Sequence, residues 1–166
     1  MATAVLPKDN ALPWLWLSAL LIGLDQATKW LAVASLPYQV QVGFVPGLWN
    51  WHLTHNTGAA FSFLAGEDGW QRWLFAAIAI AACVAMAWLL RRGGSALFCA
   101  GLALIIGGAL GNLYDRLVLG HVVDFLLVHY RGWYFPAFNV ADSAITIGAA
   151  ALIVDSFLDR RPNARR

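Results

Sequence analysis

Long apolar runs separated by short polar segments dominate the chain. A helix that crosses a bilayer needs about 20 mostly apolar residues, and four segments approach that length: residues 12–36, 73–90, 97–113 and 140–158. The second and third are uncharged and are joined by the short basic turn "RRGGSA", so they predict a helical hairpin. The pattern therefore predicts a single integral membrane domain, residues 1–166, with four transmembrane helices.

The first segment is the most polar of the four, because it contains Asp25 and Lys29. Its alternative interpretation is a cleaved signal peptide, since Lys8 precedes an apolar core and the small residues "AVAS" resemble a cleavage site. The later apolar segments, and the charge pair between core and cleavage site, favour a helix that is retained.

Between the first two apolar segments the pattern changes to that of a strand. Trp49, Trp51 and Leu53 alternate with polar residues, which is the period of two expected of a half-buried strand. "FSF" at 61–63 continues the pattern. We expect residues 38–65 to form a small extracytoplasmic β-platform whose aromatic face rests at the level of the lipid head groups. The fold class is thus a mainly α membrane protein.

The positive charges predict the orientation. Arg91 and Arg92 lie between the second and third helices, Lys8 precedes the first, and four arginines follow the fourth. Because cytoplasmic loops carry the excess of Lys and Arg, both termini are expected in the cytoplasm. The platform and residues 114–139 then face the other side of the membrane.

Composition agrees with a membrane protein. The chain is 60% hydrophobic and 12% charged, whereas soluble domains carry roughly 25% charge. The net charge of +2 includes no basic face, so nucleic acid is not an expected partner. Cys83 and Cys99 lie in apolar runs without metal-ligand spacing, which indicates neither a disulfide framework nor a zinc site.

Two carboxylates near the predicted outer membrane edge need a chemical reason. Asp124 lies within "VVDFLLV", where an unpaired charge is costly, and an ionisable residue at membrane depth is by default a functional hypothesis. The 17 residues between Asp124 and Asp142 include Pro136 and leave room for the chain to turn back. Two carboxylates that meet share one proton, and such a pair can activate water and protonate a carbonyl oxygen or leaving amine.

A structural alternative exists for Asp142. Asn139 followed three residues later by Asp142 matches the pattern that caps the start of a helix. Other hydrolytic chemistry is less favoured, because Ser62 and Ser143 lie in no "GxSxG" setting and the histidines lack "HExxH" spacing.

Other polar and small residues also have two interpretations. Asp25 and Lys29 are spaced as an i,i+4 ion pair, and the alternative is that they hold substrate. Asn56 and Asn112 lie at the outer edge, where an amide can orient a carboxylate or bind a substrate backbone. Arg116 beside Asp115 reads as a helix-end pair.

The third helix also contains Gly107 and Gly111, a small-xxx-small pair that allows close packing against a neighbouring helix. Packing is the interpretation that we adopt for both glycines.

Five blocks, in order along nearly the whole chain, resemble those of the lipoprotein signal peptidase (signal peptidase II) family of bacterial intramembrane aspartyl peptidases. They are "LDQATK", "HNTGAAFSF", "GGALGNLYDR", "GHVVDF" and "FNVADSAITIG". The resemblance implies a catalytic dyad of Asp124 and Asp142 without metal or other cofactor. It implies supporting or substrate-binding roles for Asp25, Lys29, Asn56, Asn112, Arg116 and Asn139, and a place for Gly108 and Ala141 in the lining of the site.

The resemblance also implies a substrate, a bacterial prolipoprotein whose cysteine bears a diacylglyceryl group, cut just before that cysteine. The enzyme would act as a monomer in the cell inner membrane, surrounded by lipid, with its site toward the periplasm and the platform around the substrate. The alternative is a small transporter or lipid-binding scaffold with carboxylates that relay protons or bind a cation. That class predicts internal repeats, and none is evident between the halves of the sequence.

Overall fold

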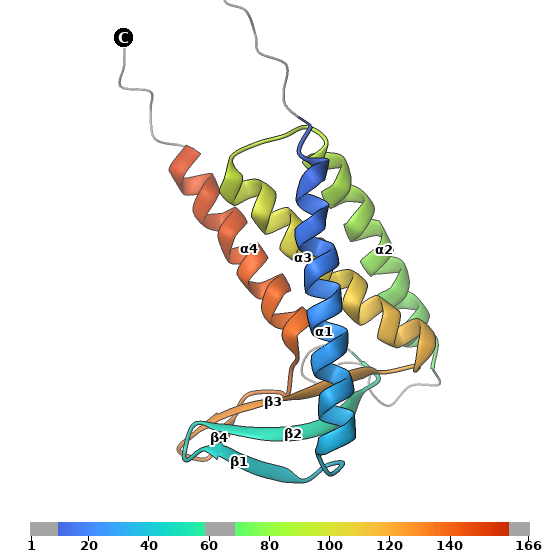
Figure 1. Ribbon diagram of the computed structural model, residues 1–166, viewed down its shortest axis with the longest axis vertical. Helices are drawn as coiled ribbons and strands as arrows, with labels where there is room; N and C mark the ends of the chain where they lie inside the picture. The colour runs from blue at the N-terminus through green and yellow to red at the C-terminus, as the bar shows by residue number, and fades with distance from the viewer. Residues whose placement is uncertain (1–9, 59–68, 160–166) are drawn as a thin grey trace, which may run out of the picture.

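The computed structural model describes residues 10–58 and 69–159. Long helices stand side by side, and a four-stranded antiparallel sheet lies across one end of them (Figure 1). In chain order the elements are η1 (Leu12–Trp14), α1 (Leu15–Ser35), β1 (Gln41–Val45), β2 (Trp49–Asn56), α2 (Trp70–Leu90), α3 (Ala96–Val118), β3 (Val122–Tyr130), β4 (Trp133–Tyr134) and α4 (Val140–Asp159).

The central helix is α3, which is mostly buried, whereas α2 and α4 are mostly exposed. Figure 1 shows the other helices arranged around it. Small residues permit the close approach: a Cβ on Gly101 would lie 2.9 Å from the Gly148 oxygen of α4, and one on Gly107 would lie 3.0 Å from Ser18 Cα of α1. Ser18 Oγ also donates a hydrogen bond to the Ala103 oxygen at 2.7 Å. The packing role predicted for Gly107 is confirmed.

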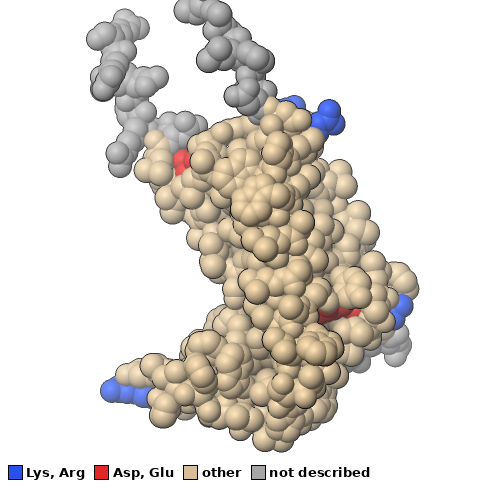
Figure 2. Space-filling view, viewed as in Figure 1, with Lys and Arg blue, Asp and Glu red and all other residues tan. Residues whose placement is uncertain are grey.

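Three of the described helices are long and apolar enough to cross a membrane, namely α2, α3 and α4 as far as Leu158. Helix α1 has the predicted place and a length of 21 residues, but it does not reach the same hydropathy, so its span remains a prediction. The third helix continues to Val118, past the predicted end at residue 113. Figure 2 shows that uncharged residues cover nearly all of the visible bundle surface.

The sheet is larger than the predicted platform. β1 and β2 lie within residues 38–65, as predicted, but β2 also pairs with β3, which pairs with β4. The strand predicted at 61–63 lies outside the described residues. The sequence did not reveal β3 because its first four residues are all buried, and a strand buried on both faces loses the alternation of apolar and polar positions.

The sheet packs against the end of α1. Ala32 of α1 forms one buried cluster with Leu53, Val123 and Phe125 of the sheet. In Figure 1 the sheet lies at the end of the bundle opposite the α2–α3 turn, which carries Arg91 and Arg92. The contact with α1 therefore holds β3 at the end of the bundle where α4 begins. Both cysteines are free, with Cys99 buried and Cys83 half-buried.

Candidate active site

Asp124 and Asp142 come from different elements and meet where the sheet joins the helices. Asp124 is the third residue of β3, and Asp142 lies in the first turn of α4. Asn139 connects them, because its Nδ2 donates to Asp124 Oδ1 at 2.7 Å while its Oδ1 accepts the Asp142 backbone N–H at 2.9 Å. The two carboxylates therefore lie on either side of one asparagine.

The same asparagine caps α4. The Asn139 backbone N–H donates to Asp142 Oδ2 at 3.3 Å, and this bond is reciprocal to the one from the Asp142 N–H. Two such bonds make the capping box, so the capping interpretation of the sequence is confirmed. It does not compete with a functional role, because the amide nitrogen of Asn139 remains available to Asp124.

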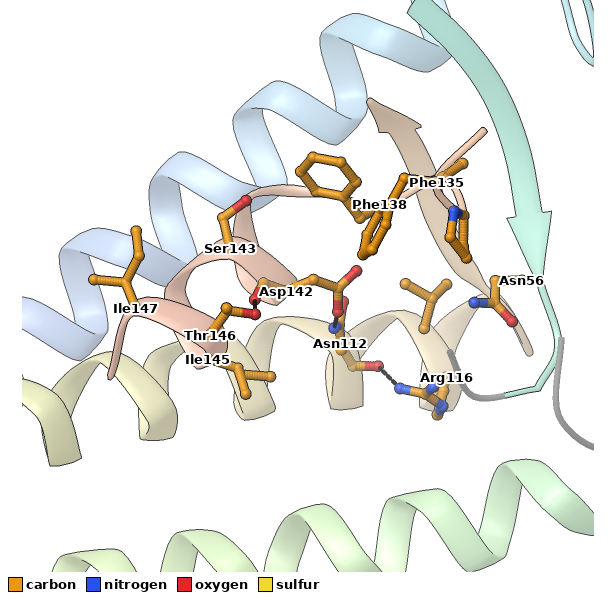
Figure 3. A pocket seen from close by; sticks show the side chains of 13 residues that line it. Asn56, Asn112, Arg116, Phe135, Phe138, Asp142, Ser143, Ile145, Thr146 and Ile147 are labelled. Atoms are coloured by element: carbon orange, nitrogen blue, oxygen red, sulfur yellow. Dashed lines mark hydrogen bonds between the residues drawn. The ribbon is translucent and has the colours of Figure 1, made fainter. Parts of the chain in front are cut away.

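Asn112 of α3 orients Asp142. Its Nδ2 donates to Asp142 Oδ1 at 2.7 Å, and Figure 3 shows the two side chains pointing toward each other. Its Oδ1 accepts from Lys29 Nζ at 2.9 Å and from Asn139 Nδ2 at 3.2 Å. Because an ammonium can only donate, Lys29 fixes which end of the amide faces the carboxylate.

Asn56, the last residue of β2, completes the surroundings of Asp124. Its Nδ2 donates to Asp124 Oδ2 at 3.2 Å, while its Oδ1 accepts the Gly58 N–H at 3.0 Å. Together with the bond from Asn139, both carboxylate oxygens of Asp124 accept an amide. Asp124 is 1% exposed, so these amides replace water as its hydrogen-bond partners.

Burial and the nearby charge of Asp142 raise the pKa of Asp124 from 3.8 to about 7. The hydrogen bonds from Asn56 and Asn139 and the charge of Lys29 act in the opposite direction, because each stabilises the ionised carboxylate. A pKa near 7 lets the Asp124 carboxyl gain or lose a proton at neutral pH, which is a property that general acid–base catalysis uses.

A buried ion triad lies behind the dyad. Lys29 Nζ is 2.8 Å from Asp25 Oδ2 and 2.8 Å from Asp115 Oδ2, and the three side chains are at most 3% exposed. Gln26 Nε2 donates to Asp115 Oδ1 at 2.9 Å. The i,i+4 ion pair predicted for Asp25 and Lys29 is present, and neither residue lines the cavity described below.

Each carboxylate of the triad holds the backbone next to one aspartate of the dyad. Asp25 Oδ1 accepts the N–H of Ala141 at 2.9 Å, and Asp115 Oδ2 accepts the N–H of Val123 at 3.1 Å. The three charges hold α1 and α3 together, and removing one of them would leave an uncompensated buried charge. Because the two carboxylates also bind the backbone of Ala141 and Val123, the packing of these helices and the placement of both aspartates depend on each other.

Asp115 was missed by the sequence interpretation, which paired it with Arg116. Among the described residues, no salt bridge joins these neighbours, because Asp115 binds Lys29 instead. The helix-end pair is therefore wrong. A signal did exist: Asp115 follows Asn112 by three residues and Gly111 by four, which places all three on one face of a helix.

A cavity of about 550 Å³ opens beside Asp142. Figure 3 shows its polar side, formed by Asn56, Asn112, Arg116 and Asp142. Its apolar side includes Phe135, Pro136, Phe138, Ile145 and Ile147. The site can thus hold a peptide bond next to a carboxylate and an apolar group opposite. Within the described residues no three His, Cys, Asp or Glu side chains form a candidate metal site.

Arg116 connects the cavity to the β2–α2 segment. Its Nη2 donates to the Gly58 oxygen at 3.0 Å and its Nη1 to the Asn112 oxygen at 3.4 Å. The guanidinium also lies 5.3 Å from the ring centre of Phe75 on α2. Arg116 therefore brings a positive charge to the cavity without neutralising either aspartate through a salt bridge.

Gly108 and Ala141 lie in the helix interface next to the cavity and are not among its lining residues. A Cβ on Gly108 would collide with the Ala141 oxygen and would lie 2.8 Å from Ile145 Cγ1. A Cβ on Gly111 would lie 2.7 Å from Asp25 Oδ2. These small residues let α3 approach the first turn of α4, and so they set the distance across which Asn112 reaches Asp142.

Comparisons with known proteins agree on one family. The model of the family described as signal peptidase (SPase) II matches residues 17–158. The lipoprotein signal peptidase of Pseudomonas paraeruginosa is 56% identical over 157 residues, covering 93% of each chain. That of Pseudomonas aeruginosa PAO1 is 55% identical over the same length, again covering 93% of each chain.

Solved structures show the same architecture. One, described as a bacterial membrane enzyme, superposes with a TM-score of 0.84 at 26% identity and covers 97% of this chain and 98% of its own. A second with the same description has a TM-score of 0.79 at 27% identity, covering 93% and 99%. The mostly helical fold with one small sheet is therefore shared with membrane enzymes.

Proposed function

The chain belongs to the signal peptidase II family of proteases, and we propose that it removes the signal peptide from diacylglyceryl-modified prolipoproteins by cutting just before the lipidated cysteine. The names of its relatives support a lipoprotein precursor as substrate. The observation that carries the proposal is the junction at Asn139, where one residue binds Asp124 and caps the helix turn that holds Asp142.

The dyad catalyses hydrolysis by acid–base chemistry. One carboxylate accepts a proton from water, which attacks the scissile carbonyl, while the other donates its proton to the carbonyl oxygen. When the tetrahedral intermediate collapses, the first carboxyl passes the proton it took from water to the leaving amine, and the second recovers a proton from a hydroxyl of the intermediate, so that the pair again carries one proton. The raised pKa of Asp124, about 7, supports a pair that carries one proton at neutral pH. We assign that proton to Asp124 and Asp142 jointly, because strongly coupled groups titrate as a pair.

The surrounding residues position the reacting groups. Asn112 and Asn139 orient the carboxylates, and Arg116 and Asn56 border the cavity where the substrate backbone binds. The buried triad acts through the backbone of Ala141 and Val123. Support for these roles comes from hydrogen bonds: the three asparagines donate to the aspartates, and the triad accepts from the backbone next to them. Arg116 donates to the backbone oxygens of Asn112 and Gly58.

The apolar side of the cavity suits a lipid-modified cysteine. Ile147, one of its lining residues, is 59% exposed on α4, a helix apolar enough to cross the bilayer. An acyl chain therefore reaches the cavity from the bilayer without crossing water. This supports a substrate that remains anchored in the membrane while its peptide bond lies at the dyad.

We place the enzyme in the bacterial inner membrane with both termini in the cytoplasm, the sheet on the periplasmic side against the lipid surface, and the monomer as the working unit. Its basic α2–α3 turn and its sheet lie at opposite ends of the bundle (Figure 1), which supports this orientation. The transporter alternative has no comparable support.

The test is a cleavage assay with purified full-length protein in a bilayer. A precursor bearing diacylglyceryl on its cysteine should give a product whose first residue is the lipidated cysteine, identified by mass spectrometry. The same precursor without the lipid is the matched control and should not be cut at a comparable rate. Equal cleavage of both substrates, or a cut at another bond, would reject the proposed specificity.

A further inference from the structure

The turn between β3 and β4 holds an arginine in a conformation that arginine disfavours. Arg131 and Gly132 are its central residues, with φ of +49° and +83°, between the paired residues Tyr130 and Trp133. Two positive φ values characterise the I′ hairpin turn, in which Asn or Gly is strongly preferred. Gly132 meets that preference and Arg131 does not, so the side chain of Arg131 does not serve the turn itself.

Arg131 is also isolated among uncharged residues. Residues 38–58 and 119–139, which contain the whole sheet, hold only one other Asp, Glu, Lys or Arg, Asp124, and that residue is 1% exposed. The exposed Arg131 guanidinium lies 5.2 Å from the Tyr130 ring centre. Figure 2 shows a basic projection at the outer end of the sheet. The charge of Arg131 is therefore exposed, and no exposed carboxylate lies in these two segments to pair with it.

Aromatic side chains flank this charge. Tyr130, Trp133 and Tyr134 are 54%, 63% and 49% exposed. Trp and Tyr concentrate where the hydrocarbon of a bilayer meets its head groups, and arginine binds phosphate through paired N–H donors. Because the membrane-spanning helices end at the sheet (Figure 1), lipid head groups lie at the height of this hairpin.

We propose that the Arg131 tip, residues 130–133, is a phospholipid-binding site in which the guanidinium binds a head-group phosphate and the aromatic rings enter the interface. The inner part of the sheet is held by the helices through Ala32 and Phe125. The tip gives the outer end a second attachment, to the bilayer itself. The proposal concerns the position of the sheet and is independent of the chemistry assigned to the aspartates.

The experiment measures the depth of the hairpin in a bilayer. Full-length protein with Cys83→Ala and Cys99→Ala carries one nitroxide at Val128→Cys, and its collisions with oxygen and with a water-soluble nickel chelate report the immersion depth. One bilayer consists of phosphatidylethanolamine and phosphatidylglycerol, and the other of a galactosyl diacylglycerol without phosphate.

In the phospholipid bilayer, Arg131→Asn should shift the label toward water. Arg131→Lys should shift it less, because lysine keeps the positive charge and loses only the paired N–H donors of the guanidinium. Asn suits a positive φ, so the turn is preserved. In the phosphate-free bilayer the parent and Arg131→Asn should coincide. The matched control is Arg92→Asn, an exposed arginine 3.5 Å from the Trp88 ring centre in the opposite turn, which should leave the depth unchanged.

Three results would overturn the proposal. Equal depth of the parent and Arg131→Asn in phospholipid would remove the role of the guanidinium. An equal shift in both bilayers would show that phosphate is not the ligand. A shift that appears only after lipidated precursor is added would assign the tip to substrate binding instead.

Discussion

Asn139 donates its side-chain amide to Asp124 at 2.7 Å and at the same time closes the capping box around Asp142. Asn139 therefore sets where α4 starts and also holds Asp124 of β3 close to that start. Because its two amide atoms serve different aspartates, a change at this position alters local helix stability and dyad geometry together. The predictions below separate these effects.

Asp124→Asn and Asp142→Asn should each lower kcat/KM for the lipidated precursor by at least ~1,000-fold, because an amide keeps the shape of the carboxyl but cannot exchange its proton. Thermal unfolding should show that both variants remain folded. Normal cleavage by Asp142→Asn, combined with only a loss of helix stability in Asn139→Ala, would leave capping as the sole role of Asp142.

Asn56→Ala should move the pH profile of kcat/KM upward. The pKa of Asp124 is about 7, and the hydrogen bond from Asn56 lowers it, so removing that bond raises the pKa further. In the proposed mechanism the dyad is active with one proton and loses activity as pH rises through that pKa, so the decline on the alkaline side should begin at higher pH than in the parent. An unchanged or lower alkaline limb would contradict the assignment.

Lys29→Met should destabilise the fold by ~3–5 kcal/mol, because it leaves Asp25 and Asp115 buried without their cation. Activity should fall with it, since both carboxylates hold backbone next to the dyad. The control is Ser18→Ala, which breaks one hydrogen bond between the same two helices and should cost ~1 kcal/mol. Similar unfolding temperatures for the two variants would refute a special role for the triad.

Gly108→Ala should reduce kcat more than it reduces thermal stability. Its new Cβ meets the Ala141 oxygen, so the first turn of α4 must shift away from Asn112. Gly23→Ala on α1 is the control, because a Cβ there meets no atom within 4 Å and alanine is ~0.5–1 kcal/mol better than glycine in a helix. Matching kcat values in the two variants would show that this contact does not position the dyad.

Single cysteines at Arg92 and Tyr134, in a background without Cys83 and Cys99, should react with a membrane-impermeant reagent from opposite sides of the membrane. Arg92 lies in the α2–α3 turn, and Tyr134 is 49% exposed on β4. The positive-inside rule predicts that Arg92 faces the cytoplasm, so intact cells stripped of their outer membrane should label only Tyr134. Labelling of both positions would reject the proposed orientation.

The sequence alone determined the features that depend on neighbours along the chain. Apolar runs of helical length located the long helices, since burial of a helix in lipid requires uninterrupted apolar residues. The cap formed by Asn139 and Asp142 was also readable, because its bonds join residues three apart. The alternation of apolar and polar residues around Trp51 revealed β2, while the fully buried start of β3 gave no such signal.

Only the tertiary structure decided which distant residues meet. Asp25 and Ala141 are 116 positions apart, yet they share a hydrogen bond. Asp115 forms its ion pair with Lys29, which helix packing brings close, and not with its sequence neighbour Arg116. A carboxylate next to an arginine looks like a pair because short-range spacing is all that a sequence pattern records. The close approach of α1 to α3 makes Lys29 the partner of Asp115. Two carboxylates are buried there, and they require a nearby cation because an unpaired charge is costly in the low-dielectric interior.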